Sequence, residues 1–378
     1  MGEALENHAS RVLGLIRPGV PADAALREYL PGRRTLGAVG RRSVSRAVFA
    51  YFRWLNWLED GESEQRRVVA TLGLQARFER DPSGFKAEAL AARAVPGWLA
   101  AEMELTPAFL RAIQREPALW IRAKSERAEA VAAALGDCER PPPAAGPAPG
   151  ALRYRGTADL HRTPGFQSGD FEMQDLSSQL VGHACAPAPG ETWWDACSGE
   201  GGKALHLCDL MGNKGLIWAT DRSERRLTTL RRRAARAGMF NYRAASWTGS
   251  GPAPFRTGCD GVLVDAPCSG VGTWQRNPHA RWTTSPGDVR ELAAVQAALL
   301  GRAAPSVKPG GRLVYSVCTL TRSETAAVAD GFEAAHPDFE PSPLAIAPRG
   351  EPAGFRISIF PQDLDSNGMF IAAWRRRR

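Results

Sequence analysis

The segment TWWDACSGEGGKALHL, residues 192–207, places a glycine-rich turn between a strand pattern and a helix pattern. From about residue 173 onward further strand and helix patterns alternate. The strands are GLIWATD, GVLVD and GRLVYSVC, and the helices are RSERRLTTLRRRAARAG, DVRELAAVQAALLGRAA and SETAAVADGFEAAH. This alternation is typical of a mostly parallel, doubly wound sheet covered by helices. We therefore expect an α/β, Rossmann-like domain over residues 173–378.

Two different patterns precede that domain. Residues 1–110 show helical spacing, including an aromatic stripe in SRAVFAYFRWLNWLED, and predict an all-α accessory domain. Residues 111–172 contain the strand patterns ALWIRAK and ALRYRG around a helix pattern, which predicts a small α/β module. The run PPPAAGPAPG, residues 141–150, is either a loop of this module or a linker between domains.

Composition narrows the classes of protein. No apolar run approaches the roughly 20 residues that cross a bilayer, and the N-terminus lacks the pattern of a secretion signal, so we expect a cytoplasmic protein without membrane contact. Seven cysteines without a CxxC pair predict reduced thiols and no metal site. The net charge of +8 favours a polyanionic partner, nucleic acid above all, although a solvated arginine-rich surface would give the same balance.

The glycine turn predicts a nucleotide-type site. Gly199, Gly201 and Gly202 allow close approach of the backbone and offer amides at a helix N-terminus. Asp221 ends the next strand, where a carboxylate commonly binds ribose hydroxyls. Neither GxGxxG nor GxxxxGK[ST] is present. These features favour a methyl donor over a dinucleotide, and a dehydrogenase stays as an alternative.

Two strands end on a cysteine. Cys268 follows Asp265-Ala266-Pro267, and Cys318 precedes Thr319. The carboxyl ends of parallel strands share one edge, so both thiols can face one pocket. Thiolate addition to carbon 6 of cytosine activates carbon 5 for methylation, after which a second group assists release while Asp265 steadies the ring nitrogen. Alternatively, both are core cysteines.

Over roughly residues 117–374 the chain resembles the Nop/Sun, or RsmB-like, RNA cytosine-5 methyltransferases. The resemblance rests on FEMQDLSSQLVGHACAPAPGE, DACSGEGGK, DRSERRLTTLRRRAARAG, DAPCSGVGTWQRNPHARW, YSVCTLTRSE and SNGMFIAAWRR, which follow one another in the family's order. The helical N-terminal region is similar in placement to the NusB-like domain of bacterial members.

The resemblance implies a covalent mechanism that uses S-adenosylmethionine. It implies that Cys318 is the nucleophile and Cys268 the release assistant, with Asp265 and Lys203 beside them. The donor site that it implies comprises Cys197, Ser198, Gly199, Glu200, Gly201, Gly202, Lys203, Asp221, Arg226, Trp247 and Asp265. It implies an RNA substrate, ribosomal above transfer RNA, and a monomeric enzyme.

Three positions depart from the family pattern. Ser198-Gly199-Glu200 stands where the family usually has Ala-Ala-Pro, so an acid lies next to the donor. Trp247 lies where an aspartate usually binds the adenine amino group, and we expect it to stack instead. Val317 replaces a threonine before the nucleophile. The alternative hypothesis is a non-catalytic RNA-binding factor with a degenerate donor site.

Basic residues suggest where RNA would bind. One predicted helix carries Arg222, Arg225, Arg226, Arg231, Arg232, Arg233 and Arg236. This face binds phosphates or is simply solvated. The segment QRNPHARW is expected to clamp the target nucleotide through Arg276, Arg281 or Trp282.

Overall fold

The computed structural model of the chain describes residues 4–33, 36–146, 148–346, 348 and 354–378. Internal contacts divide it into two units. Unit 1 comprises residues 1–117 and 273–286, and unit 2 comprises 118–272 and 287–378. This grouping differs from the three consecutive segments expected from the sequence: the small α/β module belongs with the large sheet, and a segment after Cys268 belongs with the N-terminal helices.

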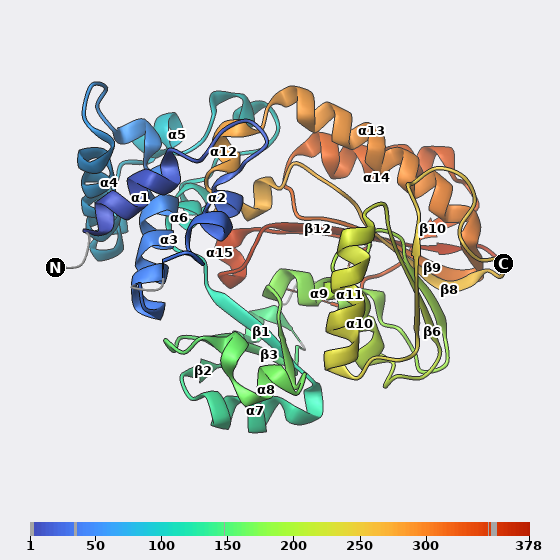
Figure 1. Cartoon of the computed structure of the whole chain (residues 1–378). Coiled ribbons are helices and arrows are strands. Elements are labelled where there is room, and N and C mark those ends of the chain that lie inside the picture. The colour runs from blue at the N-terminus through green and yellow to red at the C-terminus, as the bar shows by residue number, and fades with distance from the viewer. Residues whose placement is uncertain (1–3, 34–35, 147, 347, 349–353) are drawn as a thin grey trace. The chain divides into compact units, whose positions relative to one another are not determined.

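Unit 1 is helical, as expected for the N-terminal region (Figure 1). Its helices are α1 (Leu5–Leu13), α2 (Ala22–Tyr29), α3 (Ala38–Arg53), α4 (Glu64–Arg80), α5 (Ala87–Arg93), α6 (Pro107–Gln114) and α12 (Ala280–Thr283). Val12, Val44, Val48 and Val68 are fully buried where α1, α3 and α4 pack together. The aromatic stripe therefore belongs to a core. Its helix ends at Arg53, and residues 55–57 form a separate 3-10 turn.

Unit 2 begins with a four-stranded antiparallel sheet in the order β2-β3-β1-β4. Its strands are β1 (Leu119–Ala123), β2 (Cys138–Glu139), β3 (Ala151–Tyr154) and β4 (Phe171–Met173), accompanied by α7 (Ala128–Leu135) and α8 (Pro164–Gln167). The proline-rich run connects β2 to β3, which are hydrogen-bonded neighbours. It is therefore a loop within this sheet and not a linker between domains.

The large sheet of unit 2 has eight strands. Seven follow the order β10-β12-β9-β8-β5-β6-β7, and β11 pairs with β12. The strands are β5 (Thr192–Asp195), β6 (Leu216–Asp221), β7 (Tyr242–Ser246), β8 (Cys259–Asp265), β9 (Val307–Val317), β10 (Phe339–Pro341), β11 (Arg356–Ile359) and β12 (Met369–Arg376). β5 to β9 run parallel to one another, and β12 is antiparallel to β9. The expected pairing of the two cysteine-bearing strands, β8 and β9, is confirmed.

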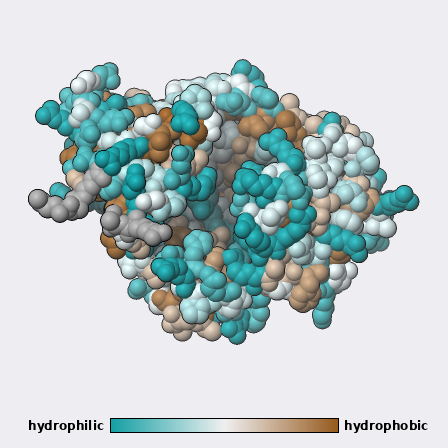
Figure 2. Space-filling model, viewed as in Figure 1, coloured by the Kyte–Doolittle hydropathy of each residue, from teal (hydrophilic) through white to brown (hydrophobic). Residues whose placement is uncertain are grey.

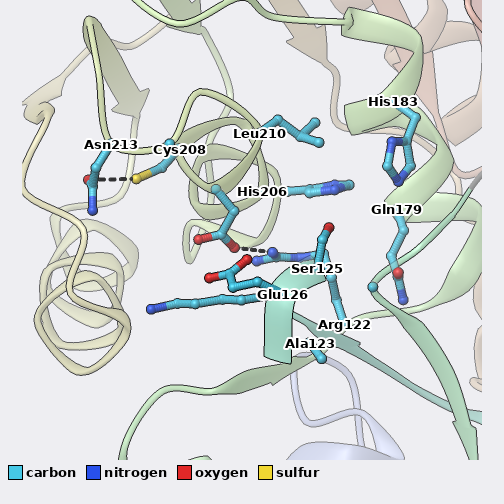
Figure 3. A pocket seen from close by; sticks show the side chains of 14 residues that line it. Arg122, Ala123, Ser125, Glu126, Gln179, His183, His206, Cys208, Leu210 and Asn213 are labelled. Carbon is cyan, nitrogen blue, oxygen red and sulfur yellow. Dashed lines mark hydrogen bonds and ion pairs between the residues drawn. The ribbon is translucent and has the colours of Figure 1, made fainter. Parts of the chain in front are cut away.

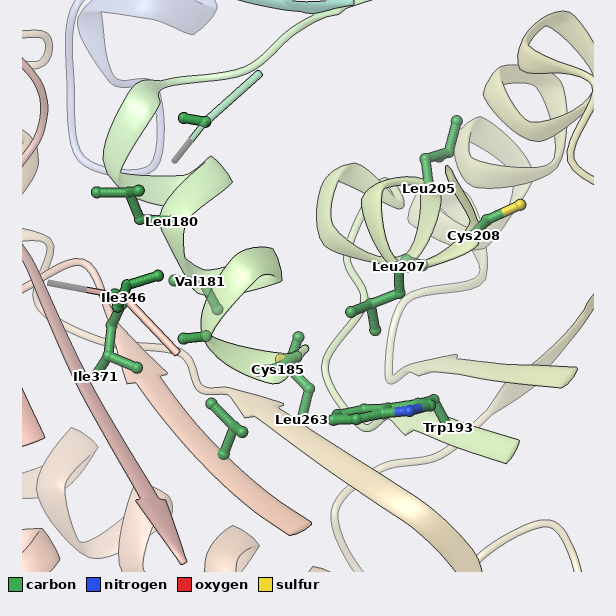
Figure 4. Packing of buried hydrophobic residues seen from close by; sticks show 14 of the residues in the cluster. Leu180, Val181, Cys185, Trp193, Leu205, Leu207, Cys208, Leu263, Ile346 and Ile371 are labelled. Carbon is green, nitrogen blue, oxygen red and sulfur yellow. The ribbon is translucent and has the colours of Figure 1, made fainter. Parts of the chain in front are cut away.

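Helices cover both faces of this sheet, which confirms the doubly wound α/β class (Figure 1). The helices are α9 (Leu176–Cys185), α10 (Gly202–Leu210), α11 (Glu224–Ala237), α13 (Pro286–Ala303), α14 (Ala326–Ala335) and α15 (Pro361–Leu364). Trp193 packs with Leu180 and Leu207 on the face of α9 and α10 (Figure 4), whereas Trp194 packs with Leu300 on the opposite face. Burying a tryptophan contributes about 4–6 kcal/mol at about 25 cal/mol per Å².

Among the helices that the structure describes, none combines the length and apolar character that spanning a bilayer requires.

Candidate active site

The order of the parallel strands locates the site. The chain runs outward from β5 through β6 to β7, and then returns to place β8 on the other side of β5. A crevice at the carboxyl ends of strands forms where this order reverses, which here lies between β5 and β8. The glycine turn follows β5, and Asp265 ends β8. Sequence reasoning thus brought the correct segments to one edge.

The glycine turn is held against β6 by backbone contacts. The Ser198 amide donates to the Thr220 carbonyl (2.8 Å), as does the Ser198 hydroxyl (3.1 Å). Gly201 has a φ of +88°, and a Cβ there would lie 2.8 Å from a side-chain carbon of Leu230. Glycine is therefore required at this position. A Cβ on Gly199 or Gly202 would meet no atom within 4 Å, so the turn borders open space on that side.

Asp221 connects the glycine turn to α11. Its carboxylate accepts hydrogen bonds from the amides of Gly199 (3.1 Å) and Ser223 (2.7 Å). Arg226 lies 3.9 Å from the same carboxylate, with about half of its side chain exposed. These contacts orient the Asp221 carboxylate toward the glycine turn. Asp221, which we expected to bind the ribose of the methyl donor, is thus a neighbour of the glycine turn, which we expected to bind the rest of the donor.

An ion pair lies at the end of β8. Lys203 Nζ is 2.7 Å from Asp265 Oδ2, and the Ser316 hydroxyl donates to Asp265 Oδ1 at 2.7 Å. Burial opposes the charge on Lys203, but the Asp265 carboxylate outweighs it and raises the pKa of the ammonium group. Lys203 is therefore a cation, and its contact with Asp265 holds that side chain in place.

The two thiols are adjacent. Cys268 Sγ and Cys318 Sγ lie 3.4 Å apart, and both side chains are partly exposed. The hydrogen bond from Cys268, supported by the charge of Lys203, lowers the pKa of Cys318 despite its burial. The same contact, followed by burial, raises the pKa of Cys268. Cys318 is accordingly the thiol that ionises first, and Cys268 the one that holds a proton.

Other titratable groups beneath the turn are insulated from water. Asp195 is completely buried at the end of β5, and burial together with the nearby Asp265 raises its pKa to about 8. Burial also raises the pKa of Cys197. A thiol in that state is a poor nucleophile, which leaves Cys318 as the reactive cysteine of this edge.

Two predicted donor contacts differ in detail from the expectation. Trp247 is only 6% exposed, and its ring lies in the core in edge contact with Trp194, with ring centroids 4.8 Å apart. Little of that ring is left to stack on a ligand, although its amide donates to the Asp221 carbonyl. Glu200 points to solvent, and its carbonyl accepts a hydrogen bond from Arg233 (2.9 Å).

The prediction that Arg281 clamps a nucleotide is wrong, whereas Trp282 is half-buried and its predicted role stays a prediction. Arg281 is completely buried within unit 1, where it donates to Gln114 Oε1 (2.6 Å) and to the carbonyls of Ala94 (3.2 Å) and Ile113. The Trp282 indole donates to the Phe52 carbonyl at 2.7 Å. Both side chains anchor residues 273–286 to the N-terminal helices. Arg276 is exposed and stays a candidate.

The arginines of α11, together with Arg222 just before the helix, include ion-paired and unpaired residues. Arg233 and Arg236 are ion-paired with the buried carboxylate of Glu172, and Arg231 pairs with Glu224. Arg222, Arg225 and Arg232 are exposed, and within the described ranges no carboxylate pairs with them. Figure 2 shows a hydrophilic surface over α11. The helix thus holds free positive charge at its surface, as a phosphate-binding face requires.

A separate cavity of about 270 Å³ lies between β1, α9 and α10 (Figure 3). It is lined by Arg122, Lys124, Gln179, His183, His206, Cys208 and Asp209, among others, and by none of the predicted site residues. Arg122 is paired there with Asp209, and burial lowers the pKa values of both His183 and His206. His206 Nδ1 is buried without a hydrogen-bond partner in the described part of the chain, but nothing else in the cavity indicates what it would bind, and we do not assign it a ligand.

Sequence reasoning missed a buried polar cluster behind the thiols, formed by Glu324, Gln296, Thr319, Thr321 and Ser269. The signal was present in the run TLTRSE, whose polar residues Thr319, Thr321 and Glu324 follow Cys318 at the end of an apolar strand. Such residues are normally solvated, and only the fold shows that they face inward.

Comparisons with known proteins agree with this arrangement. Residues 183–375 match the family described as 16S rRNA methyltransferase RsmB/F. A Synechocystis protein described as a probable ribosomal RNA small subunit methyltransferase B is 36% identical over 287 residues, which are 73% of this chain and 63% of that protein. The chain spans about half to two thirds of the length of the curated relatives that it matches.

Solved structures share the fold. The crystal structure of PH0851 has a TM-score of 0.80 at 23% identity and covers 99% of both chains. The crystal structure of NSun6 from Pyrococcus horikoshii with SFG has a TM-score of 0.64 at 18% identity and covers 77% of this chain and 97% of that one.

Proposed function

Because the chain belongs to the RsmB/F family of 16S rRNA methyltransferases, we propose that it methylates carbon 5 of a cytosine in ribosomal RNA, using S-adenosylmethionine. The observation that carries the proposal is the thiol pair, 3.4 Å apart, beside the Lys203–Asp265 ion pair. A polarised pair of thiols next to a fixed acid is what covalent activation of a pyrimidine requires. The expected cytoplasmic, monomeric state belongs to the same proposal.

The glycine turn fits S-adenosylmethionine. The turn borders open space at Gly199 and Gly202, and we expect the adjacent Asp221 carboxylate to accept hydrogen bonds from ribose hydroxyls. Cys197, Ser198, Glu200, Gly201 and Arg226 complete this wall, whereas the buried Trp247 contributes through its backbone. When bound, the donor would supply an electrophilic methyl group. SFG, an analogue of this donor, accompanies the related NSun6 structure.

The two cysteines divide the reaction. The Cys318 thiolate adds to carbon 6 of cytosine, and the electron pair moves to carbon 5, which becomes nucleophilic toward the methyl group. The negative charge of the adduct reaches ring nitrogen 3, which takes up a proton from solvent. Asp265, held by Lys203 and Ser316, accepts a hydrogen bond from the protonated nitrogen and stabilises the adduct. After methylation the carbon 5 proton passes to solvent, its bonding electrons re-form the 5,6 double bond, and Cys318 leaves carbon 6 as a thiolate. Cys268, which keeps its proton, assists this release by donating a hydrogen bond to the departing sulfur.

Single substitutions test this division. We expect Cys318→Ala to abolish transfer of tritiated methyl groups to protein-free 16S rRNA, because no adduct forms. We expect Cys268→Ala to accumulate a protein–RNA adduct that survives denaturing electrophoresis, because release fails. Unchanged turnover in Cys318→Ala would overturn the proposal, and adducts in that variant instead of in Cys268→Ala would reverse the roles.

Glu200 motivates the second candidate, an RNA-binding factor without donor affinity. Calorimetry separates the two: no heat at millimolar S-adenosylmethionine favours the RNA-binding factor. Bisulfite sequencing of ribosomal and transfer RNA from a deletion strain identifies the modified RNA and distinguishes a transfer-RNA substrate.

A further inference from the structure

One buried carboxylate contacts the loops that follow both cysteines. Glu324 lies in a short 3-10 turn before α14 and is completely buried. Its Oε1 accepts hydrogen bonds from the Ser269 amide (2.8 Å) and Gln296 (3.0 Å). Its Oε2 accepts from the hydroxyls of Thr321 (2.7 Å), Thr319 (3.2 Å) and Ser269.

Two of these donors come directly after the two cysteines in the sequence. Ser269 directly follows Cys268, and Thr319 directly follows Cys318. Their hydroxyls also lie 2.9 Å from each other. The two loops leave different strands, β8 and β9, and the Glu324 carboxylate bonds to both. It therefore acts on the separation of the two thiols without contacting either one.

Glu324 is itself rigidly placed. The Tyr315 hydroxyl donates its proton to the Glu324 backbone carbonyl oxygen at 2.6 Å, and Gln296 Oε1 lies 2.9 Å from the same hydroxyl as an alternative acceptor. Five donors on one buried carboxylate offset the cost of removing its charge from water. A carboxylate with every position filled cannot rotate without breaking several bonds, so it fixes both loops.

We propose that Glu324 is a positioning residue that sets the geometry of the Cys268–Cys318 pair and thereby makes Cys318 the reactive thiol. This inference rests on the proposed function for its catalytic consequence. Its effect on thiol reactivity is independent of RNA. The negative charge of Glu324 is also one of several causes, after the Cys318 hydrogen bond and burial, that raise the pKa of Cys268 and keep it protonated.

The deciding variant is Glu324→Gln, which keeps the side-chain volume and removes the charge. Its amide nitrogen donates where only acceptors fit, so contacts to one loop must break. We expect the rate ratio of iodoacetamide labelling, Cys318 over Cys268, to fall about tenfold, as it would for a relative pKa change of one unit. Peptide mass spectrometry reads each cysteine separately. Glu340→Gln, an exposed glutamate on β10, is the matched control.

Catalysis supplies a second measurement. We expect Glu324→Gln to lower kcat about 100-fold, the effect of a displacement of about 1 Å at reacting groups, while KM for RNA stays unchanged. A variant that melts like the wild type, with an unchanged labelling ratio and kcat, overturns the proposal. If Glu324→Gln shifts the labelling ratio but the wild-type protein itself transfers no methyl groups, the positioning role is supported and the proposed function is overturned.

Thr321→Val and Ser269→Ala keep the test open if Glu324→Gln does not fold. Each removes one hydroxyl donor to the carboxylate and leaves its charge in place. We expect the labelling ratio to fall in the same direction in both variants, by a smaller factor. No shift in either variant, with the fold intact by circular dichroism, contradicts the proposal.

Discussion

At the scale of single residues, two chemically identical side chains have different surroundings and different acidities. Cys318 and Cys268 share one hydrogen bond, and that bond lowers the pKa of one thiol and raises that of the other. Lys203 adds to the asymmetry because its cation acts on Cys318. In a coupled thiol pair of this kind the two protons are lost in two steps, and here the first to leave is that of Cys318.

The asymmetry predicts a pH shift. Cys318 reacts as a thiolate above its lowered pKa, so its labelling by iodoacetamide is retained as pH falls below the usual cysteine range and is then lost through that pKa. Cys268→Ala removes the hydrogen bond, so the pKa of Cys318 rises and the labelling midpoint moves to higher pH. Peptide-resolved labelling across a pH series measures it, with Cys138→Ala as control. A midpoint that stays or moves down contradicts the assignment.

At the scale of elements, the turn between β5 and α10 shows which glycines the fold requires. Gly201 has a positive φ and no room for a Cβ, whereas Gly202, the first residue of α10, has an ordinary φ and open space. Replacing each of these adjacent glycines by alanine should therefore change stability in opposite directions. Alanine is strained at position 201 and is favoured in the helix at position 202.

Urea unfolding tests this contrast. We expect Gly201→Ala to lower the free energy of unfolding by about 1–3 kcal/mol, the usual cost of a strained backbone. Gly202→Ala serves as its matched control, and we expect it to leave the free energy unchanged or raise it by up to about 1 kcal/mol. Equal losses in both variants would show that the turn is not built as described.

These elements also mark how far the sequence leads. Apolar periodicity and the glycine turn predicted β5, β6, β8 and β9, because burial on both faces leaves a strong local signal. The burial of Arg281 and the core position of Trp247 had no such signal. Each depends on partners distant in the chain, such as Gln114 for Arg281 and Trp194 for Trp247. The local sequence pattern predicts where strands end and which residue types stand there. It does not predict buried polar contacts, because these form only when distant segments pack together.

At the scale of the whole molecule, the net charge of +8 becomes informative once it is localised. Arg225 and Arg232 of α11, and Arg222 just before it, are exposed and have no carboxylate partner among the described residues. Arg231, Arg233 and Arg236 are instead occupied by Glu224 and Glu172. Only the first group can release counterions from an RNA backbone on binding.

Salt dependence measures that contribution. We expect Arg225→Gln combined with Arg232→Gln to weaken RNA binding and to reduce the slope of log affinity against log salt by about 1 per lost phosphate contact. Arg356→Gln, an arginine paired with Asp330, is the control and should leave the slope unchanged. If the double variant leaves the slope of log affinity against log salt unchanged, the RNA does not bind at these arginines.

The detour of residues 273–286 into unit 1 has a consequence for how such a protein can be shortened or recombined. The chain passes between the units after Pro117, after Gly272 and after Pro286, so no single cut separates them. Deleting the N-terminal helices would remove the buried acceptors of Arg281 and Trp282, which follow Cys268 in the same region of the chain. A lineage that loses or exchanges this helical unit must therefore also change the sequence that follows its Pro-Cys motif in the same step.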